Sequence, residues 1–382
     1  MKAPDGEKDI SMEKKRIPLA TPTMHIEEIQ YIQDAFDTNW IAPLGHNVDA
    51  FEKDMTRYLG VSHALATTSC TAALHLAVKL CKLQPGEVVF CSDLTFAASV
   101  NPVSYEQGKQ VFIDSDRETW NMDPVALEKA FEKYPECRVV IVVNLYGTPA
   151  KLDALREICD RHNAVLIEDA AESLSSLYRG KQTGTFGHYN AISFNGNKII
   201  TSSGGGMLLS EDAESIKKAF FWATQAKDPA PWYQHSEIGY NYRMSNVVAG
   251  IGRGQLEHID DHKARKIAIY ERYKAGLAGL PMQMNPYPED AEPNHWLSCV
   301  LLDEDCGVTP TQIIARLAEC NMESRHIWKP MHLQPVFADC DYITLGASVS
   351  EDIFARGVCL PSDIKMSPEE QAQVIACIKG LF

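Results

Sequence analysis

Between Glu87 and Asp169 the chain alternates short apolar runs with longer segments whose apolar residues recur at helical spacing. We predict buried strands at Val88–Cys91, Val111–Asp114, Val139–Val143 and Val165–Ile167, and amphipathic helices over residues 97–107, 124–134 and 152–162. Strands that are apolar on both faces and alternate with helices are typical of a parallel sheet with helices on both sides. The pattern therefore predicts an α/β fold with a mostly parallel sheet.

Outside this block the pattern predicts further helices and a change of composition. Helical spacing recurs over residues 26–36, 48–58, 213–223 and 247–277. From about Leu280 a Pro-rich stretch precedes a predicted strand at Trp296–Leu302 and helices over residues 311–320 and 368–380. We therefore predict a flexible N-terminal tail (residues 1–16), a large domain (17–255) and a smaller α+β domain (256–382).

Polar segments follow three of the predicted strands, at residues 93–96, 144–147 and 168–172. Ligands of parallel sheets bind at the carboxyl ends of the strands, so we expect these segments to contribute to one site. An acid that ends a strand often caps the next helix, and capping would be a sufficient explanation for Asp169 alone.

A lysine, Lys198, lies in a polar turn between two further apolar strands, Ala191–Phe194 and Met207–Leu209. Burial at this place would disfavour the ammonium form and lower the pKa of the lysine, as a Schiff-base lysine requires. Taken alone, the segment is also consistent with an exposed loop lysine.

The residues Ser69, Cys70 and Thr71 lead into a predicted helix. Such a helix N-terminus offers N–H groups, hydroxyls and the positive end of the helix dipole to an anion. Ordinary capping explains the hydroxyl residues as well. Capping does not explain why an anion site, a strand-end acid and a strand-end lysine are all predicted at one edge of one sheet.

Composition and charge argue against several classes of function. The 382 residues carry a formal net charge of -15, whereas nucleic-acid binding needs clustered Lys and Arg. The eleven cysteines form no C-x-x-C pair and no Cys/His cluster at zinc spacing, so we expect reduced thiols, a cytoplasmic location and no metal. Residues 1–16 lack the apolar core of a secretory signal, and the longest apolar run, Val139–Val143, is too short to span a membrane.

Seven motifs in colinear order give the chain a resemblance to a known family. They are Asn39-Trp40-Ile41, Thr68–His75, Thr95-Phe96, Glu168–Glu172, Ser193–Lys198, Gly239–Met244 and Trp328–His332. With them the chain resembles the DegT/DnrJ/EryC1/StrS family of pyridoxal-phosphate (PLP) sugar aminotransferases over about residues 17–382. The resemblance implies the aspartate-aminotransferase-type fold (PLP fold type I) and PLP as the cofactor.

The resemblance also implies roles for motif residues. Lys198 would form the Schiff base with PLP and move a proton between Cα and C4′, and Asp169 would pair with the pyridine nitrogen. Phe96 would stack on the ring, and Glu172 would lie over it near O3′. The phosphate would be held by Cys70, Thr71, Ser193 and, from the second subunit of a homodimer, Asn241.

Some positions distinguish this chain within the family it resembles. Where Cys70 stands the family usually has glycine, but a small side chain is tolerable because the backbone N–H contacts the phosphate. Where Glu172 stands glutamine or histidine is common, which leaves the role of its charge open. Lysine instead of histidine at position 198 argues against the sugar 3-dehydratases of the family.

Four residues are candidates for substrate contacts: Trp40, Arg243, Lys329 and His332. Arg243 and Lys329 would hold the acidic amino donor or the nucleotide diphosphate, unless they belong to structural ion pairs. Trp40 and His332, like the neighbouring Trp328, would serve equally well as packing residues. The sequence does not separate these alternatives.

The function implied by the resemblance is a two-step transamination. L-Glutamate would give its amino group to PLP, and the amine would pass to the C4 ketone of a UDP-4-keto-6-deoxy-N-acetylhexosamine. The product would be a UDP-4-amino-4,6-dideoxy sugar for surface glycans. The local sequence at residues 39–45, 193–198, 203–207 and 328–335 is most similar to this subgroup.

Three other functions are alternatives to this one. A GDP-perosamine-synthase-like enzyme differs only in the nucleotide and the C2 substituent. A catalytically silent PLP-binding regulator is disfavoured because Lys198 and Asp169 are both present and no DNA-binding segment is added. An ordinary amino-acid aminotransferase would need a C-terminal arginine for the substrate carboxylate, for which Arg356 is a candidate, but the sugar-family motifs outweigh it.

Overall fold

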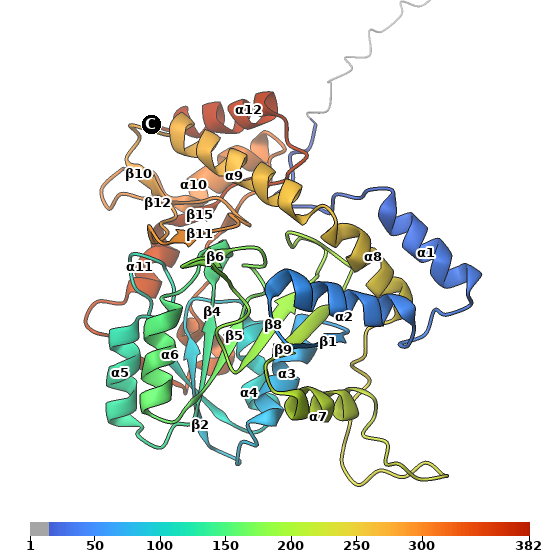
Figure 1. Ribbon diagram of the computed structural model, residues 1–382. Helices are drawn as coiled ribbons and strands as arrows, with labels where there is room; N and C mark the ends of the chain where they lie inside the picture. Colours follow the sequence, from blue (N-terminus) through green and yellow to red (C-terminus); the bar gives the residue numbers. More distant parts are fainter. Residues whose placement is uncertain (1–14) are drawn as a thin grey trace, which may run out of the picture.

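The structure, a computed structural model, describes residues 15–382 and is built around one large sheet (Figure 1). Its strands are β1 (His63–Thr67), β2 (Val88–Ser92), β3 (Lys109–Ile113), β4 (Val139–Val143), β5 (Val165–Asp169), β8 (Tyr189–Ser193), β9 (Gly206–Ser210) and β14 (Asp341–Ile343). They lie in the order β1-β9-β8-β5-β4-β2-β3-β14. Only β9 runs against the others, because its pairs with β1 and β8 are antiparallel.

Helices cover both faces of this sheet, as the sequence pattern predicts. They are α2 (His46–Leu59), α3 (Cys70–Leu80), α4 (Asn101–Tyr105), α5 (Pro124–Lys133), α6 (Leu152–Arg161) and α7 (Ala213–Ala223). Successive side chains of a strand point to opposite faces. In β4, Val139 and Ile141 therefore pack into the core with α3 and α7, whereas Val140 and Val142 pack with α5 and α6.

A second, smaller sheet lies beyond one end of the large sheet (Figure 1). It has the order β10-β12-β15-β13 and is covered by three helices. Its strands are β10 (Met282–Met284), β12 (Cys299–Leu302), β13 (Arg325–His326) and β15 (Gly357–Cys359), and its helices are α9 (Ile259–Gly276), α10 (Pro310–Glu319) and α12 (Pro368–Lys379). A third sheet joins β6 (Leu177–Tyr178), β7 (Lys181–Gln182) and β11 (Ala291–Glu292).

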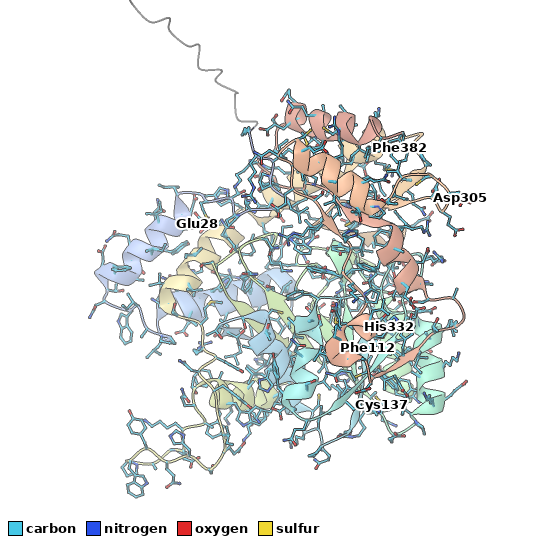
Figure 2. The ribbon with its side chains drawn as sticks, turned by 180° about the vertical axis from the view of Figure 1, so that it is seen from behind. Glu28, Phe112, Cys137, Asp305, His332 and Phe382 are labelled. Carbon is cyan, nitrogen blue, oxygen red and sulfur yellow. The ribbon has the colours of Figure 1, made fainter. Side chains whose placement is uncertain are left out.

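The C-terminal part of the chain also contributes to the large sheet. After the small sheet's strand β13 the chain returns, and β14 pairs in parallel with β3, with Tyr342 opposite Phe112. The helix α11 (Val349–Arg356) then leads back to β15. Seen from behind, His332 and Phe112 lie in the lower body and Phe382 lies at the top (Figure 2). The domain boundary at residues 255/256 stays a prediction, and most of the predicted tail, residues 1–14, lies outside the described residues.

The single helix predicted over residues 247–277 is wrong, because the chain forms two helices, α8 (Asn246–Leu256) and α9. Ala249 of α8 and Ile259, the first residue of α9, share one core, but the rest of α9 packs elsewhere. Glycines let α8 approach the N-terminal helix α1 (Glu27–Asp37) closely, and a Cβ on Gly254 would lie 2.6 Å from the backbone nitrogen of Glu28. Ile269 and Tyr273 of α9 instead lie in the core of the small sheet. Helical spacing alone does not encode this change of partner.

Two shorter predictions also change in the structure. Residues 97–107 form a 3-10 turn at Ala97–Ser99 followed by α4, and the strand predicted from Trp296 begins at Cys299. Within residues 15–382, no helix combines the length and apolar character that crossing a membrane requires.

Candidate active site

The carboxyl ends of β1, β2, β4, β5 and β8 meet at one edge of the large sheet, because these strands run in the same direction. The loops at this edge and two segments of the C-terminal part enclose a cavity of about 430 Å³. The lining includes Thr95 and Phe96 after β2, Asp169 and Glu172 after β5, and Lys198 after β8. Of the three strand-end segments expected to form one site, residues 93–96 and 168–172 contribute to the cavity lining, whereas residues 144–147 do not.

Lys198 is held between a carboxylate and an aromatic face. Its Nζ lies 3.9 Å from Glu172 Oε1 and 3.9 Å from the ring centroid of Trp296, and its side chain is 13% exposed. The indole Nε1 of Trp296 donates to the carbonyl of Asn197 at 2.7 Å, which fixes the loop beside the lysine. Lys198 is therefore not an exposed loop lysine.

Asp169 is buried at the end of β5 and faces the cavity. Ser99 Oγ donates to Oδ2 at 2.7 Å, and the backbone N–H of Ala171 donates to Oδ1 at 2.9 Å. Burial raises the pKa of Asp169, although these hydrogen bonds and the charge of Lys198 act in the opposite direction. In the part of the chain that is described, no cation lies within ion-pair distance of this carboxylate. A protonated ring nitrogen in the cavity would supply the missing positive charge.

The N-terminus of α3 also lines the cavity, and Cys70 Sγ lies 4.0 Å from Asp169 Oδ1. Ser69 caps the helix, since its Oγ accepts from the N–H of Ala72 at 3.1 Å, so the capping explanation holds for Ser69. The next residues, Cys70 and Thr71, line the cavity with the first N–H groups of the helix, which have no carbonyl partner within it. A Cβ on Gly206 would lie 2.3 Å from the nitrogen of Cys70. Only glycine lets β9 begin this close to a site that suits a phosphate.

An aromatic wall closes the cavity on the side of the C-terminal part. The rings of Phe96 and Trp328 lie 5.2 Å apart, and the N–H of Trp328 donates to Tyr146 Oη at 2.9 Å. Glu172 accepts hydrogen bonds from the backbone N–H of Tyr146 at 2.7 Å and from the indole N–H of Trp328 at 3.3 Å. Burial raises the pKa of Glu172, and Lys198 partly offsets this shift. Glu172 therefore connects the aromatic wall with the lysine.

Three candidate residues lie outside this cavity in their own chain. Arg243 is buried in an ion pair with Glu52 and donates to the carbonyl of Ala66 at 3.2 Å, as expected for a structural ion pair. Asn241 is exposed beside a neighbouring hollow that Arg243 also lines. Trp40 is 51% exposed, and its carbonyl accepts a hydrogen bond from Asn246. Ser193, in contrast, lines the cavity at the end of β8.

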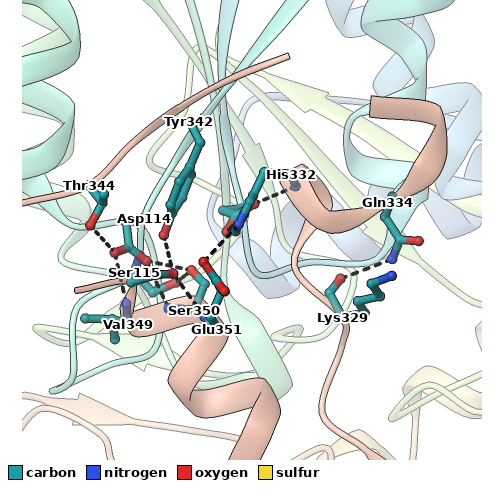
Figure 3. Close-up of polar contacts among 12 residues, drawn as sticks. Asp114, Ser115, Lys329, His332, Gln334, Tyr342, Thr344, Val349, Ser350 and Glu351 are labelled. Carbon is teal, nitrogen blue, oxygen red and sulfur yellow. Dashed lines mark hydrogen bonds and ion pairs between the residues drawn. The ribbon is translucent and has the colours of Figure 1, made fainter. Parts of the chain in front are cut away.

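Neither His332 nor Lys329 lines the cavity. Figure 3 shows His332 among its polar partners. His332 Nδ1 lies 2.8 Å from Asp93 Oδ2, its Nε2 lies 3.3 Å from Glu351, and its ring stacks on Tyr342 with centroids 3.9 Å apart. The side chain of Lys329 is exposed. His332 thus fixes the returning C-terminal segment to the loop after β2, which favours the packing interpretation for this residue.

The structure adds two residues that the sequence analysis missed, Arg325 and Trp296, which both line the cavity. Arg325 lies on β13, a strand of two residues that has no periodic signal. Its place three residues before the Trp328 motif is the signal that could have indicated it. Arg356, the candidate for an amino-acid carboxylate, is paired with Asp352 and donates to the carbonyl of Leu302.

A largely buried lysine, a buried strand-end acid and a helix N-terminus surround one cavity on this fold, as expected for the class of PLP-dependent aminotransferases. The chain matches the DegT/DnrJ/EryC1/StrS aminotransferase family over residues 22–379 and belongs to it. It is a sugar aminotransferase with PLP as its cofactor.

Relatives of known name cover nearly the whole chain. "Putative pyridoxal phosphate-dependent aminotransferase EpsN" of Bacillus subtilis (strain 168) is 48% identical over 375 residues, which are 96% of each chain. GDP-perosamine synthase of Caulobacter vibrioides is 35% identical over 95% of this chain and 97% of its own.

Solved structures of similar proteins have the same fold. A DegT DnrJ EryC1 StrS aminotransferase from Brucella abortus superposes with a TM-score of 0.86 at 26% identity, over 93% of this chain and 95% of its own. The aminotransferase TlmJ from Streptoalloteichus hindustanus superposes with a TM-score of 0.87 at 25% identity, over 95% of this chain and 98% of its own.

Proposed function

We propose that the protein transfers the amino group of L-glutamate to the C4 ketone of a UDP-4-keto-6-deoxy-N-acetylhexosamine. The product is a UDP-4-amino-4,6-dideoxy sugar for surface glycans, and the location is cytoplasmic. The observation that carries the transamination is the placement of Lys198, Asp169 and the N-terminus of α3 around one cavity. The choice of a UDP-linked acetamido sugar is supported by the local sequence at residues 39–45 and 328–335.

Each residue of the cavity has a task that follows from its position. PLP, when bound, supplies an electron sink that stabilises negative charge at the reacting carbon. Asp169 would hold the proton on the pyridine nitrogen, and Ser193 with the N–H groups of Cys70 and Thr71 would hold the phosphate. Lys198 Nζ would move the proton at Cα of the donor and later at C4 of the sugar. Glu172 keeps this amine at the cavity wall.

We further propose a homodimer in which each active site uses residues of both subunits. Exposed apolar side chains occur at the start of α1 and along it, on the loop that follows it and on the loop after α7. These segments lie on the side of the molecule away from α5 and α6 (Figure 1). The side chains are Ile26, Ile29, Phe36, Trp40, Ile41, Leu44, Trp232, Tyr233 and Ile238. Apolar surface of this kind marks a protein interface. Asn241, exposed next to this surface, would then hold the phosphate of the partner's cofactor.

A GDP-linked 4-ketosugar is the second candidate substrate. It is favoured by a specific observation, since relatives named GDP-perosamine synthase from three organisms are 35%, 32% and 32% identical to this chain. The two candidates share the chemistry at C4 and differ in the nucleotide and the C2 substituent.

Turnover with matched sugars tests the proposal. The PLP-loaded protein is given L-glutamate and then a UDP-4-keto-6-deoxy-N-acetylhexosamine, a GDP-4-keto-6-deoxyhexose or a dTDP-4-keto-6-deoxyhexose, and the aminated sugar is measured by mass spectrometry. We expect amination of the UDP sugar by the wild type and by the control K217A, whose lysine is 77% exposed on α7, and none by K198A. Amination of only the GDP or dTDP sugar would contradict the proposed substrate.

A further inference from the structure

The cavity has one cation that the proposed roles leave unused. Among its lining residues in the described chain, the cationic side chains are Lys198 and Arg325, and the carboxylates are Asp169 and Glu172. Lys198 lies beside Glu172, and Asp169 would face the ring nitrogen of the cofactor. Arg325 has neither role, and its ion-pair partner, Glu323, does not line the cavity.

Arg325 is held in place by groups that leave most of its donors available. Its strand β13 pairs with β15, with Arg325 opposite Cys359. One guanidinium nitrogen donates to Glu323 Oε1 at 2.8 Å, and Glu323 Oε2 is itself fixed by the N–H of Leu19 at 3.2 Å. The guanidinium has five N–H donors, and its side chain is 56% exposed. The remaining donors can bind a planar pair of anionic oxygens.

The other cations suggested by the sequence have different positions. Arg243 is engaged by Glu52, and Arg356 is engaged by Asp352 and the carbonyl of Leu302. Lys329 is exposed outside the cavity lining. Arg325 is thus the candidate cation that lines the cavity with Lys198.

We propose that Arg325 binds the anionic oxygens of the substrates in this cavity. This inference rests on the proposed function, in which the amino donor leaves before the nucleotide sugar enters the same cavity. Both substrates carry anionic oxygens: those of the amino donor belong to carboxylates, and those of the nucleotide sugar belong to a diphosphate. Arg325 can therefore bind the carboxylate, the diphosphate or each in turn, because both groups present paired oxygens to a guanidinium.

Equilibrium binding separates the two sources of this anion. Glutarate, an unreactive dicarboxylate, and the nucleotides UDP and GDP are titrated by calorimetry into the PLP-loaded wild type and the variants R325Q, R325K and R316Q. Arg316 is the matched control, since it pairs with Glu319 at 2.9 Å on α10 and does not line the cavity. Retained PLP absorbance and far-UV circular dichroism verify that each variant is folded.

We expect R325Q to raise the Kd of at least one probe by about 10- to 100-fold, because a charge-assisted contact is lost. R325K, which keeps the charge but loses the planar fork, is expected to lie between R325Q and the wild type, and R316Q to equal the wild type. A loss confined to glutarate assigns the donor carboxylate, a loss confined to a nucleotide assigns the diphosphate, and losses of both assign both.

The proposal is overturned if R325Q binds all three probes within about twofold of the wild type, or if the wild type binds none of them. If the proposed UDP-linked substrate is wrong, the binding experiment gives a different result. In that case GDP binds in place of UDP, and the comparison of R325Q with the wild type is still made with GDP and glutarate.

Discussion

At the scale of single residues, the two carboxylates of the site, Asp169 and Glu172, differ in the groups that surround them. Burial raises the pKa of both Asp169 and Glu172. Glu172 has Lys198 at 3.9 Å, whereas Asp169 has hydrogen bonds from Ser99 and Ala171 but no cation at ion-pair distance within residues 15–382. A buried carboxylate in that state favours a cationic ligand. We therefore expect the charge of Asp169 to contribute strongly to cofactor binding.

The substitution D169N tests this charge. Asparagine keeps the shape but cannot stabilise a protonated ring nitrogen, so we expect weaker PLP binding and a loss of about 10²- to 10³-fold in turnover. The dissociation constant of PLP is measured by absorbance titration, and turnover is measured by the formation of 2-oxoglutarate from L-glutamate. Unchanged PLP affinity together with unchanged turnover would show that the charge of Asp169 has no part in the site.

At the scale of elements, α9 supports the cavity through a buried lysine. Lys266 Nζ donates to the carbonyl of Trp296 at 2.8 Å and to the carbonyl of Ser362 at 2.6 Å. The helix is thereby tied to the segment whose indole ring faces Lys198. Burial lowers the pKa of Lys266 to about 8 from its ordinary value of 10.5, and Asp363 opposes the shift. The helix thus contains a titrating group near neutral pH.

This lowered pKa predicts the pH dependence of stability. Between pH 8 and 10.5 the unfolded chain holds more protons on Lys266 than the folded chain, so the free energy of unfolding should rise with pH in this window. The full rise is about 3 kcal/mol. Urea unfolding of the wild type and K266M at several pH values measures it, since other titrating groups cancel in the difference. A difference that does not change with pH would contradict the prediction.

The last helix, α12, begins with a capping box that can be tested separately. Ser367 Oγ accepts from the N–H of Glu370 at 3.2 Å, and Glu370 Oε2 accepts from the N–H of Ser367 at 2.9 Å. S367A should lower the free energy of unfolding by about 1 kcal/mol, because an N–H of the first turn loses its acceptor. S367T keeps a hydroxyl and serves as the control. Equal denaturant midpoints for S367A and the wild type would argue against a stabilising cap.

At the scale of the whole molecule, the cavity combines segments that are far apart in the sequence. The large sheet supplies Asp169, the loop after β8 supplies Lys198, and the C-terminal part supplies Trp296, Arg325 and Trp328. Asn241 lies outside the cavity of its own chain, beside exposed apolar surface. These positions are consistent with an assembly in which a second copy completes each site.

Mixing two inactive variants tests the shared site. If Asn241 acts on the partner's cofactor, K198A and N241D are each expected to have little activity as homodimers. In a heterodimer, one site joins an intact Lys198 to an intact Asn241 of the partner. Reassembly of an equal mixture should then restore about a quarter of the wild-type activity. Activity that stays at the level of the separate variants, in a mixture shown by mass spectrometry to contain heterodimers, would contradict a shared site.

The sequence by itself determined the parts of this protein that depend on local pattern. The continuous apolar run Val139–Val143 indicated a strand buried on both faces, and it forms β4 at the centre of the large sheet. Alternation of strands and helices placed Asp169 and Lys198 at one sheet edge, because parallel strands align their carboxyl ends. The motifs indicated the family to which the chain belongs.

Only the tertiary structure decided which distant segments meet. The three residues of β14 join the large sheet because β3 offers an open edge, and α9 separates from α8 because most of it packs into the core of the small sheet. Arg325 and Trp296 reach the cavity through pairing and packing with residues far along the chain. Periodicity records whether a position is buried and in which element, whereas a cavity depends on contacts between elements, which no local pattern contains.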